Sequence, residues 1–140
     1  VLTLLIIFGG IHRVAKFSST VVAIGQNDAN PDNYMPKDYN GGKAKKWRAH
    51  YESFVRKLMQ LYPEAHIILA TTILMHDAAW DRAIDDVCMQ IASERVHHFL
   101  YRRNGAGTPG HIRIPEAEEM AEELAGYIEK SCLEKGINNE

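Results

Sequence analysis

Residues 20–25 have the sequence TVVAIG, and residues 66–72, HIILATT, repeat the same pattern. Apolar side chains fill both runs without the polar alternation of a half-exposed strand. Such runs are typical of strands that are buried on both faces of a parallel sheet. On either side of them we predict a further strand over residues 95–101 (RVHHFLY) and a buried strand over residues 1–8 (VLTLLIIF).

Amphipathic helices are predicted between and after these strands. Over residues 43–62 apolar side chains recur at steps of three and four residues, and Pro63 ends the pattern. Asp77 fits the N-cap of a second helix, whose buried stripe is Trp80, Ala83, Ile84, Val87, Cys88 and Ile91. Pro115 suits the first turn of a last helix, whose inward positions are Ala117, Met120, Ala121, Leu124 and Ile128. Residues 26–42 are predicted as a long loop.

The alternation of strands and helices predicts one α/β domain over residues 1–140, with a parallel sheet covered by helices on both faces. The composition agrees, because 46% of the 140 residues are hydrophobic and 24% are charged. A net charge of −2 does not indicate a basic surface for binding nucleic acid or an anionic membrane. The two cysteines, Cys88 and Cys132, fit neither a disulfide framework nor a zinc site, and no cofactor is expected.

Polar clusters follow three of the predicted strands. They are Gln26-Asn27-Asp28, His76-Asp77 with Trp80 close behind, and residues 108–111 (TPGH). In an open parallel sheet, ligands bind outside the carboxyl ends of the strands. An asparagine amide, a histidine and an aromatic wall meeting there would supply the oxyanion donor, general base and apolar surface of an acyl-transfer site.

Structural interpretations compete with these functional ones. Asn27 would also fit an Asx-turn after Gly25. His97 and His98 are adjacent on a strand and therefore point to opposite faces, so we expect no shared metal ion. We expect the aromatic stripe of Trp47, Tyr51 and Phe54 to belong to the core.

The segment over residues 21–28 (VVAIGQND) resembles the GxND block of the SGNH, or GDSL-type, hydrolases. Residues 107–111 (GTPGH), followed by an Ala/Glu-rich helix, are similar to the final histidine block of that family. The order of the two blocks and the 84-residue spacing from Asn27 to His111 are similar as well. The resemblance covers residues 18–135 and is nearest to carbohydrate-directed acetyl esterases. It implies a three-layer α/β/α fold with a flavodoxin-like parallel sheet.

The resemblance also implies a reaction and roles for individual residues. The reaction is hydrolysis of an acetylated carbohydrate or small acyl ester through an acyl-serine intermediate. Asn27 would donate to the oxyanion, and His111 would be the general base. Gly10, or Gly9 beside it, would correspond to the glycine block that supplies a second oxyanion donor. The neighbouring candidates for binding the substrate are Gln26, Asp28, His76 and Trp80.

Two features depart from the family pattern. No Gly-Asp-Ser block occurs, and the serines are only Ser18, Ser19, Ser53, Ser93 and Ser131. Thr108 stands where the family carries an aspartate before its histidine. We therefore expect the C-terminal part of a longer hydrolase that lacks its first strand–helix unit, with residues 1–8 or a second copy of the chain filling the gap. The alternative is a non-catalytic binding or scaffold domain that retains the pocket. A nucleotide-binding protein is disfavoured, since no Gly-rich phosphate loop follows any predicted strand.

Overall fold

The computed structural model describes residues 4–7 and 19–133 and has a four-stranded sheet with the order β1-β2-β3-β4. The strands are β1 (Leu4–Ile7), β2 (Ser19–Ala23), β3 (His66–Ala70) and β4 (Val96–Phe99). β2, β3 and β4 are parallel, with Val21 beside Ile68 and Ile68 beside His97. β1 pairs with β2 in the antiparallel direction. The parallel arrangement predicted for the chain therefore holds for three of its strands.

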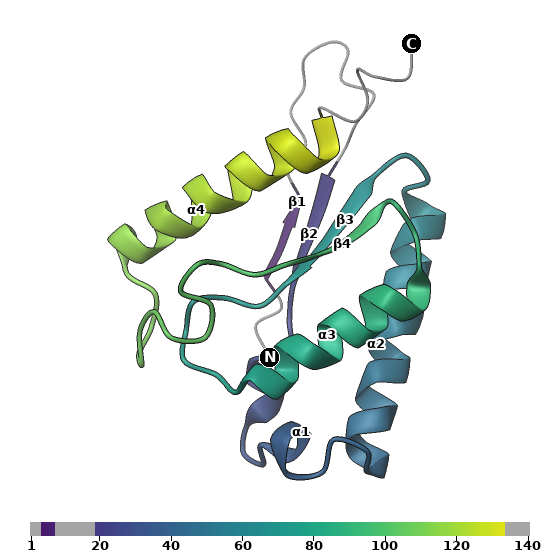
Figure 1. Ribbon diagram of the computed structural model, residues 1–140, viewed down its shortest axis with the longest axis vertical. Helices are drawn as coiled ribbons and strands as arrows, with labels where there is room; N and C mark the ends of the chain where they lie inside the picture. Colours follow the sequence, from purple (N-terminus) through teal and green to yellow (C-terminus); the bar gives the residue numbers. More distant parts are fainter. Residues whose placement is uncertain (1–3, 8–18, 134–140) are drawn as a thin grey trace.

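Helices cover both faces of this sheet, which gives three layers (Figure 1). The helices α2 (Gly42–Leu61) and α3 (Ala78–Ile91) connect the parallel strands and lie on one face, whereas α4 (Ile114–Ile128) lies on the other. A short helix, α1 (Tyr34–Lys37), follows a 3-10 turn over Asn27–Ala29, and a π-helical turn over Glu129–Leu133 follows α4. The fold is thus α/β, and it is compatible with a flavodoxin-like arrangement.

Two apolar clusters hold the layers together. On one face Val22, Ile67 and Leu69 pack against α2 and α3, through Val55 and Ile84 among others. On the opposite face Val21, Ile68, Ala70 and Phe99 pack against Leu124 of α4. The side chains of residues 67–70 of β3 thus enter both clusters and are fully buried, as the continuous apolar run predicts.

The predicted helix faces are largely confirmed. Asp77 caps α3 by accepting a hydrogen bond from the Ala79 amide at 2.8 Å. The stripe of α3 is buried, apart from the half-buried Cys88. In α4, by contrast, Ala117 and Ala121 are exposed, and the inward face is formed by Leu124 with Met120, Tyr127 and Ile128. That part of the prediction is wrong, because only a narrow stripe of α4 faces the sheet and the two alanines lie outside it.

The predicted loop over residues 26–42 is a packed segment. Met35 of α1 is fully buried beside Ala44 and Trp80. The Trp80 indole donates a hydrogen bond to the Asn33 side chain at 2.8 Å. The Tyr39 hydroxyl donates to Asp86 of α3, and its ring lies between the guanidinium groups of Arg48 and Arg82. These contacts fix the segment that leads away from β2.

Candidate functional site

The carboxyl ends of β2, β3 and β4 carry the candidate residues. We call residues 24–28, 71–76 and 100–111 the carboxyl rim. Its first two parts are joined by side chains, since the Thr72 hydroxyl donates to the Gln26 amide oxygen and accepts from the Leu74 amide at 3.1 Å. Gln26 is therefore a structural link at the rim, directly before Asn27.

Backbone hydrogen bonds join the third part of the carboxyl rim to the second. The Gly105 amide donates to the Thr72 carbonyl at 3.1 Å, and the Gly107 amide donates to the Ile73 carbonyl at 2.7 Å. The Met75 amide donates to the Thr108 carbonyl at 2.8 Å, next to an isolated bridge between Leu74 and Thr108. Because a Cβ at Gly107 would come within 2.7 Å of Ile73, only glycine permits this close approach.

Asn27 begins the 3-10 turn that follows β2. Gly25 redirects the chain there with φ +114°, a conformation that glycine adopts readily. The Asp28 amide closes the turn on the Gly25 carbonyl at 3.1 Å. The Asn27 side chain is exposed and makes no hydrogen bond to the described residues, so it does not form the Asx-turn. Its amide is free to contact a ligand.

His111 lies three residues beyond the rim contacts of Thr108, and its side chain is exposed. The Thr108 hydroxyl accepts a hydrogen bond from the Gly110 amide at 3.3 Å. Within the described residues no acceptor holds the His111 imidazole, so the role of the family's aspartate is not taken over by Thr108. Asn27 and His111 thus belong to segments that hydrogen bonds connect through Gln26, Thr72 and residues 105–108.

None of the serines in the described part of the chain lies on the carboxyl rim. Ser19 begins β2 and Ser93 precedes β4, so both lie at the opposite edge of the sheet. Ser53 is on α2, and Ser131 is in the turn after α4. Ser18 and Gly10, the proposed second oxyanion donor, lie outside the described residues. A serine nucleophile therefore has no candidate in this part of the rim.

A buried polar network that the sequence did not reveal underlies the rim. Asp81, in the first turn of α3, accepts hydrogen bonds from the Thr71 hydroxyl at 2.7 Å and from the Asn104 side chain at 3.0 Å. Its other carboxylate oxygen lies 2.9 Å from His76 Nε2. Only His76 of these four had been singled out, because the residues are spread over 34 positions without a recognisable motif. The network ties the ends of β3 and β4 to α3.

The His76 ring has a hydrogen-bond acceptor beside each of its nitrogens. Its Nδ1 faces the Leu74 carbonyl oxygen at 2.7 Å, and its Nε2 faces a carboxylate. Both groups only accept hydrogen bonds, so they favour the protonated ring, although the Asn104 side-chain nitrogen also lies 3.4 Å from Nε2. Burial lowers the pKa of His76, but the hydrogen bond and charge of Asp81 outweigh it and raise the pKa. Burial likewise opposes ionisation of Asp81, yet the hydrogen bonds from His76 and Thr71 leave its pKa lowered.

His76 and Trp80 are therefore structural residues. The His76 side chain is only 2% exposed and both of its nitrogens are engaged, so in this conformation it presents no open surface to a substrate. Trp80 is fully buried among Met35, Ala44 and Ala83. The substrate contacts predicted for these two residues stay a prediction, and the burial of both side chains disfavours them.

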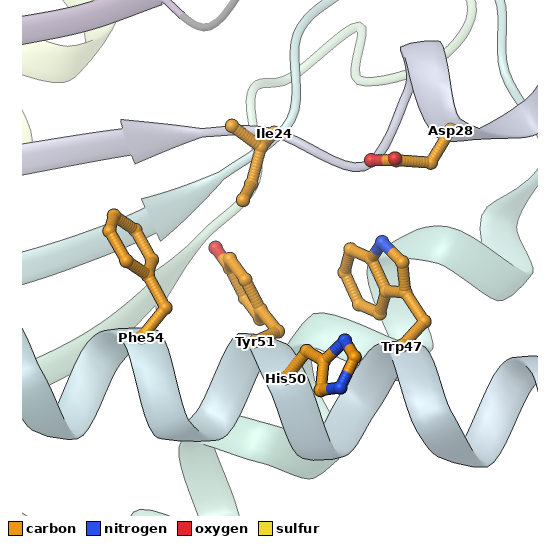
Figure 2. A pocket seen from close by; sticks show the side chains of 6 residues that line it. All are labelled: Ile24, Asp28, Trp47, His50, Tyr51 and Phe54. Carbon is orange, nitrogen blue, oxygen red and sulfur yellow. The ribbon is translucent and has the colours of Figure 1, made fainter.

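A shallow pocket of about 180 Å³ lies between the end of β2 and α2 (Figure 2). Its lining residues are Ile24, Asp28, Trp47, His50, Tyr51 and Phe54. The Trp47 and Tyr51 rings stack with their centroids 4.9 Å apart. Tyr51 is buried as predicted, but Phe54 is 39% exposed, so the aromatic stripe of α2 lines this pocket as well as the core. Because Asp28 lines the pocket and directly follows Asn27 in the chain, the pocket lies next to Asn27.

Two adjacent histidines, His97 and His98, lie on β4. His97 and His98 point to opposite faces of β4, as predicted: His97 contacts His66, with 2.8 Å between ring nitrogens, while His98 lies 3.1 Å from Asp85. No cluster of three or more His, Cys, Asp or Glu side chains that could bind a metal ion occurs among the described residues. In the same part of the chain, no helix has the length and apolar character needed to span a bilayer.

Comparisons with family models, with curated proteins and with solved structures find no match for the chain. The resemblance to SGNH hydrolases therefore depends on its two sequence blocks, and the geometry of the carboxyl rim is the structural information that bears on it.

Proposed function

We propose that the chain is part of an SGNH-type ester hydrolase that acts on an acetylated carbohydrate or a small acyl ester. The observation that supports this proposal is the connected rim. Hydrogen bonds run from Gln26 to Thr72 and from residues 72, 73 and 75 to residues 105, 107 and 108. Asn27 and His111 extend from the two ends of that chain of contacts. An SGNH site requires these two residue types at one end of a parallel sheet.

In the proposed reaction, a serine hydroxyl attacks the ester carbonyl and the alcohol leaves, which forms an acyl-serine that water then hydrolyses. His111 would accept the proton of the attacking hydroxyl and return it to the leaving alcohol. The Asn27 amide would donate a hydrogen bond to the negatively charged oxygen of the tetrahedral intermediate. The exposure of both side chains suits these roles. Under this proposal the sheet is that of an SGNH fold without its first strand–helix unit, and β1 lies beside β2 in its place.

A second candidate is a non-catalytic binding domain. The observation in its favour is that the described part of the rim holds no serine, while the pocket beside Asn27 is retained. Such a domain would bind an ester or a sugar without cleaving it.

Hydrolysis of p-nitrophenyl acetate separates the two candidates. Turnover by the chain that falls about 100-fold or more in His111→Ala, the scale of one general base, would support the esterase proposal. Lys57→Ala, at an exposed position of α2, is the matched control and should retain full activity. Absence of turnover in the unmodified chain would refute catalysis by this chain and favour the binding domain.

A further inference from the structure

The pocket between β2 and α2 has the composition of a ligand site. Trp47, Phe54 and Ile24 form apolar walls, and the polar groups are restricted to Tyr51, Asp28 and His50. In Figure 2 Phe54, Tyr51 and Trp47 rise from α2 on the side of Ile24, with Phe54 and Trp47 on either side of Tyr51, whereas His50 lies against the helix. Pockets for small ligands combine apolar walls with a few polar groups in this way.

We propose that this pocket binds a single aromatic ring that carries a hydrogen-bond acceptor. If the proposed function holds, the ring is the aromatic part of the ester, and the substrate is an aryl ester rather than an acetylated sugar. This last step rests on the proposed function, whereas the binding of the ring does not.

The size of the pocket fits one ring. Its volume is about 180 Å³, and an apolar cavity of about 150 Å³ is known to hold a benzene molecule. A ring with one small substituent therefore fills the space. A disaccharide or a long acyl chain would extend beyond it.

The Tyr51 hydroxyl provides the hydrogen bond. Tyr51 lines the pocket, and its hydroxyl, which points toward Ile24 in Figure 2, is buried and has no hydrogen-bond partner in the described part of the chain. Burial raises the pKa of Tyr51, so the hydroxyl keeps its proton and can donate it in a hydrogen bond. Buried polar groups without partners are rare, and each calls for an explanation. An acceptor on a bound ring would supply the missing partner once the side chains that cover the hydroxyl move apart to admit it.

The scarcity of polar groups disfavours a sugar. A pyranose has several hydroxyls that lose water on binding, and each needs a new partner. The pocket offers the Tyr51 hydroxyl, the Asp28 carboxylate and the His50 imidazole, of which the last two belong to exposed residues at its mouth. An aromatic ring requires one partner and gains the stacking surface of Trp47 and Phe54.

The test is an NMR titration of the ¹⁵N-labelled chain with acetophenone, which combines an aromatic ring with a carbonyl acceptor and cannot be hydrolysed. The chain has two tryptophans, so its spectrum has two indole N–H peaks, and Trp47→Phe assigns them. We expect a saturable shift of the Trp47 peak. The Trp80 peak should move little, because that indole is buried and bonded to Asn33.

Three comparisons, two with protein variants and one with a second ketone, make the test more specific. Phe54→Ala should weaken acetophenone binding at least fivefold, whereas Leu61→Ala, at an exposed apolar position of α2 outside the pocket, should not change it. Tyr51→Phe should weaken binding of acetophenone about tenfold, the scale of one hydrogen bond, and leave ethylbenzene binding unchanged. Cyclohexyl methyl ketone, which keeps the acceptor without the aromatic ring, should bind more weakly than acetophenone.

The inference is overturned if acetophenone produces no saturable shift at Trp47, if Phe54→Ala binds it as well as the unmodified chain does, or if methyl β-D-xylopyranoside binds more tightly. Its failure can be told apart from that of the proposed function. If the chain binds acetophenone but hydrolyses no aryl ester, the proposed ring-binding pocket is supported and catalysis by this chain is refuted. If the chain hydrolyses p-nitrophenyl acetate but acetophenone does not shift the Trp47 peak, catalysis is supported and the ring-binding pocket is refuted.

Discussion

The His76–Asp81 pair joins the loop after β3 to the first turn of α3, and both side chains are largely removed from solvent. Removing one partner of such a pair leaves the other charge without compensation. We therefore predict that His76→Gln lowers the free energy of unfolding by about 3 kcal/mol at pH 6, as measured by urea denaturation. His111→Gln, at an exposed histidine, should change it by less than about 0.5 kcal/mol. Equal effects of the two substitutions would show that the buried charge pair is unimportant.

The same pair predicts how stability depends on pH. Since the pKa of His76 is raised on folding, its contribution is complete below the unfolded-state pKa of about 6.5 and is lost as the pH rises through the folded-state pKa. Asp81 has a lowered pKa, so its contribution is present above about pH 3.9 and is lost as the pH falls below that value. Urea denaturation should show the stability difference between the unmodified chain and His76→Gln shrinking from pH 6 to pH 9. A constant difference would mean that His76 is neutral.

Asn27 allows a test of catalysis that does not disturb the fold. Its side chain is exposed and makes no hydrogen bond to the described residues. Under the proposed function, Asn27→Ala should reduce kcat for p-nitrophenyl acetate by about 100-fold or more, the loss expected for one oxyanion donor. Asn27→Asp, which keeps the size but not the donor, should lose as much, and Asn40→Ala should lose nothing. An unchanged kcat in Asn27→Ala removes this residue from the mechanism.

Among the secondary-structure elements, α3 ends at Ala92, an alanine in a backbone conformation that is unfavourable for it. Ala92 has φ 49° and ψ 49°, the left-handed region that glycine usually occupies after a helix. We predict that Ala92→Gly raises the free energy of unfolding by about 1 kcal/mol, because an L-residue pays a penalty of that order there. The matched control is Ala125→Gly, at an exposed position inside α4, which should lower it by about 1 kcal/mol. Thermal unfolding should show that Ala92→Gly is stabilised and Ala125→Gly is destabilised. A destabilised Ala92→Gly would refute the argument.

The sequence predicted the longer elements within two or three residues, because each has a clear apolar period or a breaker at its end. Pro63 marks the end of α2, and the Asp77 cap marks the beginning of α3. α1 was missed because four residues are too short to show a helical period. The antiparallel direction of β1 was missed as well, since an apolar run contains no information about the direction of pairing.

The candidate site could be predicted only in part. Asn27 and Asp28 follow a strand directly, so their place on the rim follows from the chain order. Trp80 bonds to Asn33, far along the chain, and the Asp81 that holds His76 also bonds to the distant Asn104, so no local pattern identifies either arrangement. The same applies to the pocket, which forms only where the stripe of α2 passes the end of β2.

For the molecule as a whole, β3 is the part that both apolar clusters share. Ile68 faces the cluster under α4, and Leu69 faces the cluster under α2 and α3. Both side chains are fully buried, so neither layer can separate from the sheet without exposing β3 to water. The two layers should therefore unfold together rather than one after the other.

This cooperativity is testable with one substitution on each face. Ile68→Ala and Leu69→Ala should each lower the free energy of unfolding by about 2–5 kcal/mol, as deletion of buried methyl groups usually does. In urea, hydrogen exchange measured by mass spectrometry should show α2 and α4 losing protection at the same midpoint in the unmodified chain. Each variant should shift both midpoints equally, although it touches only one cluster. If Ile68→Ala released α4 while α2 stayed protected, the two faces would be separate folding units, and the rim that joins β2, β3 and the loop before α4 could not act as one rigid site.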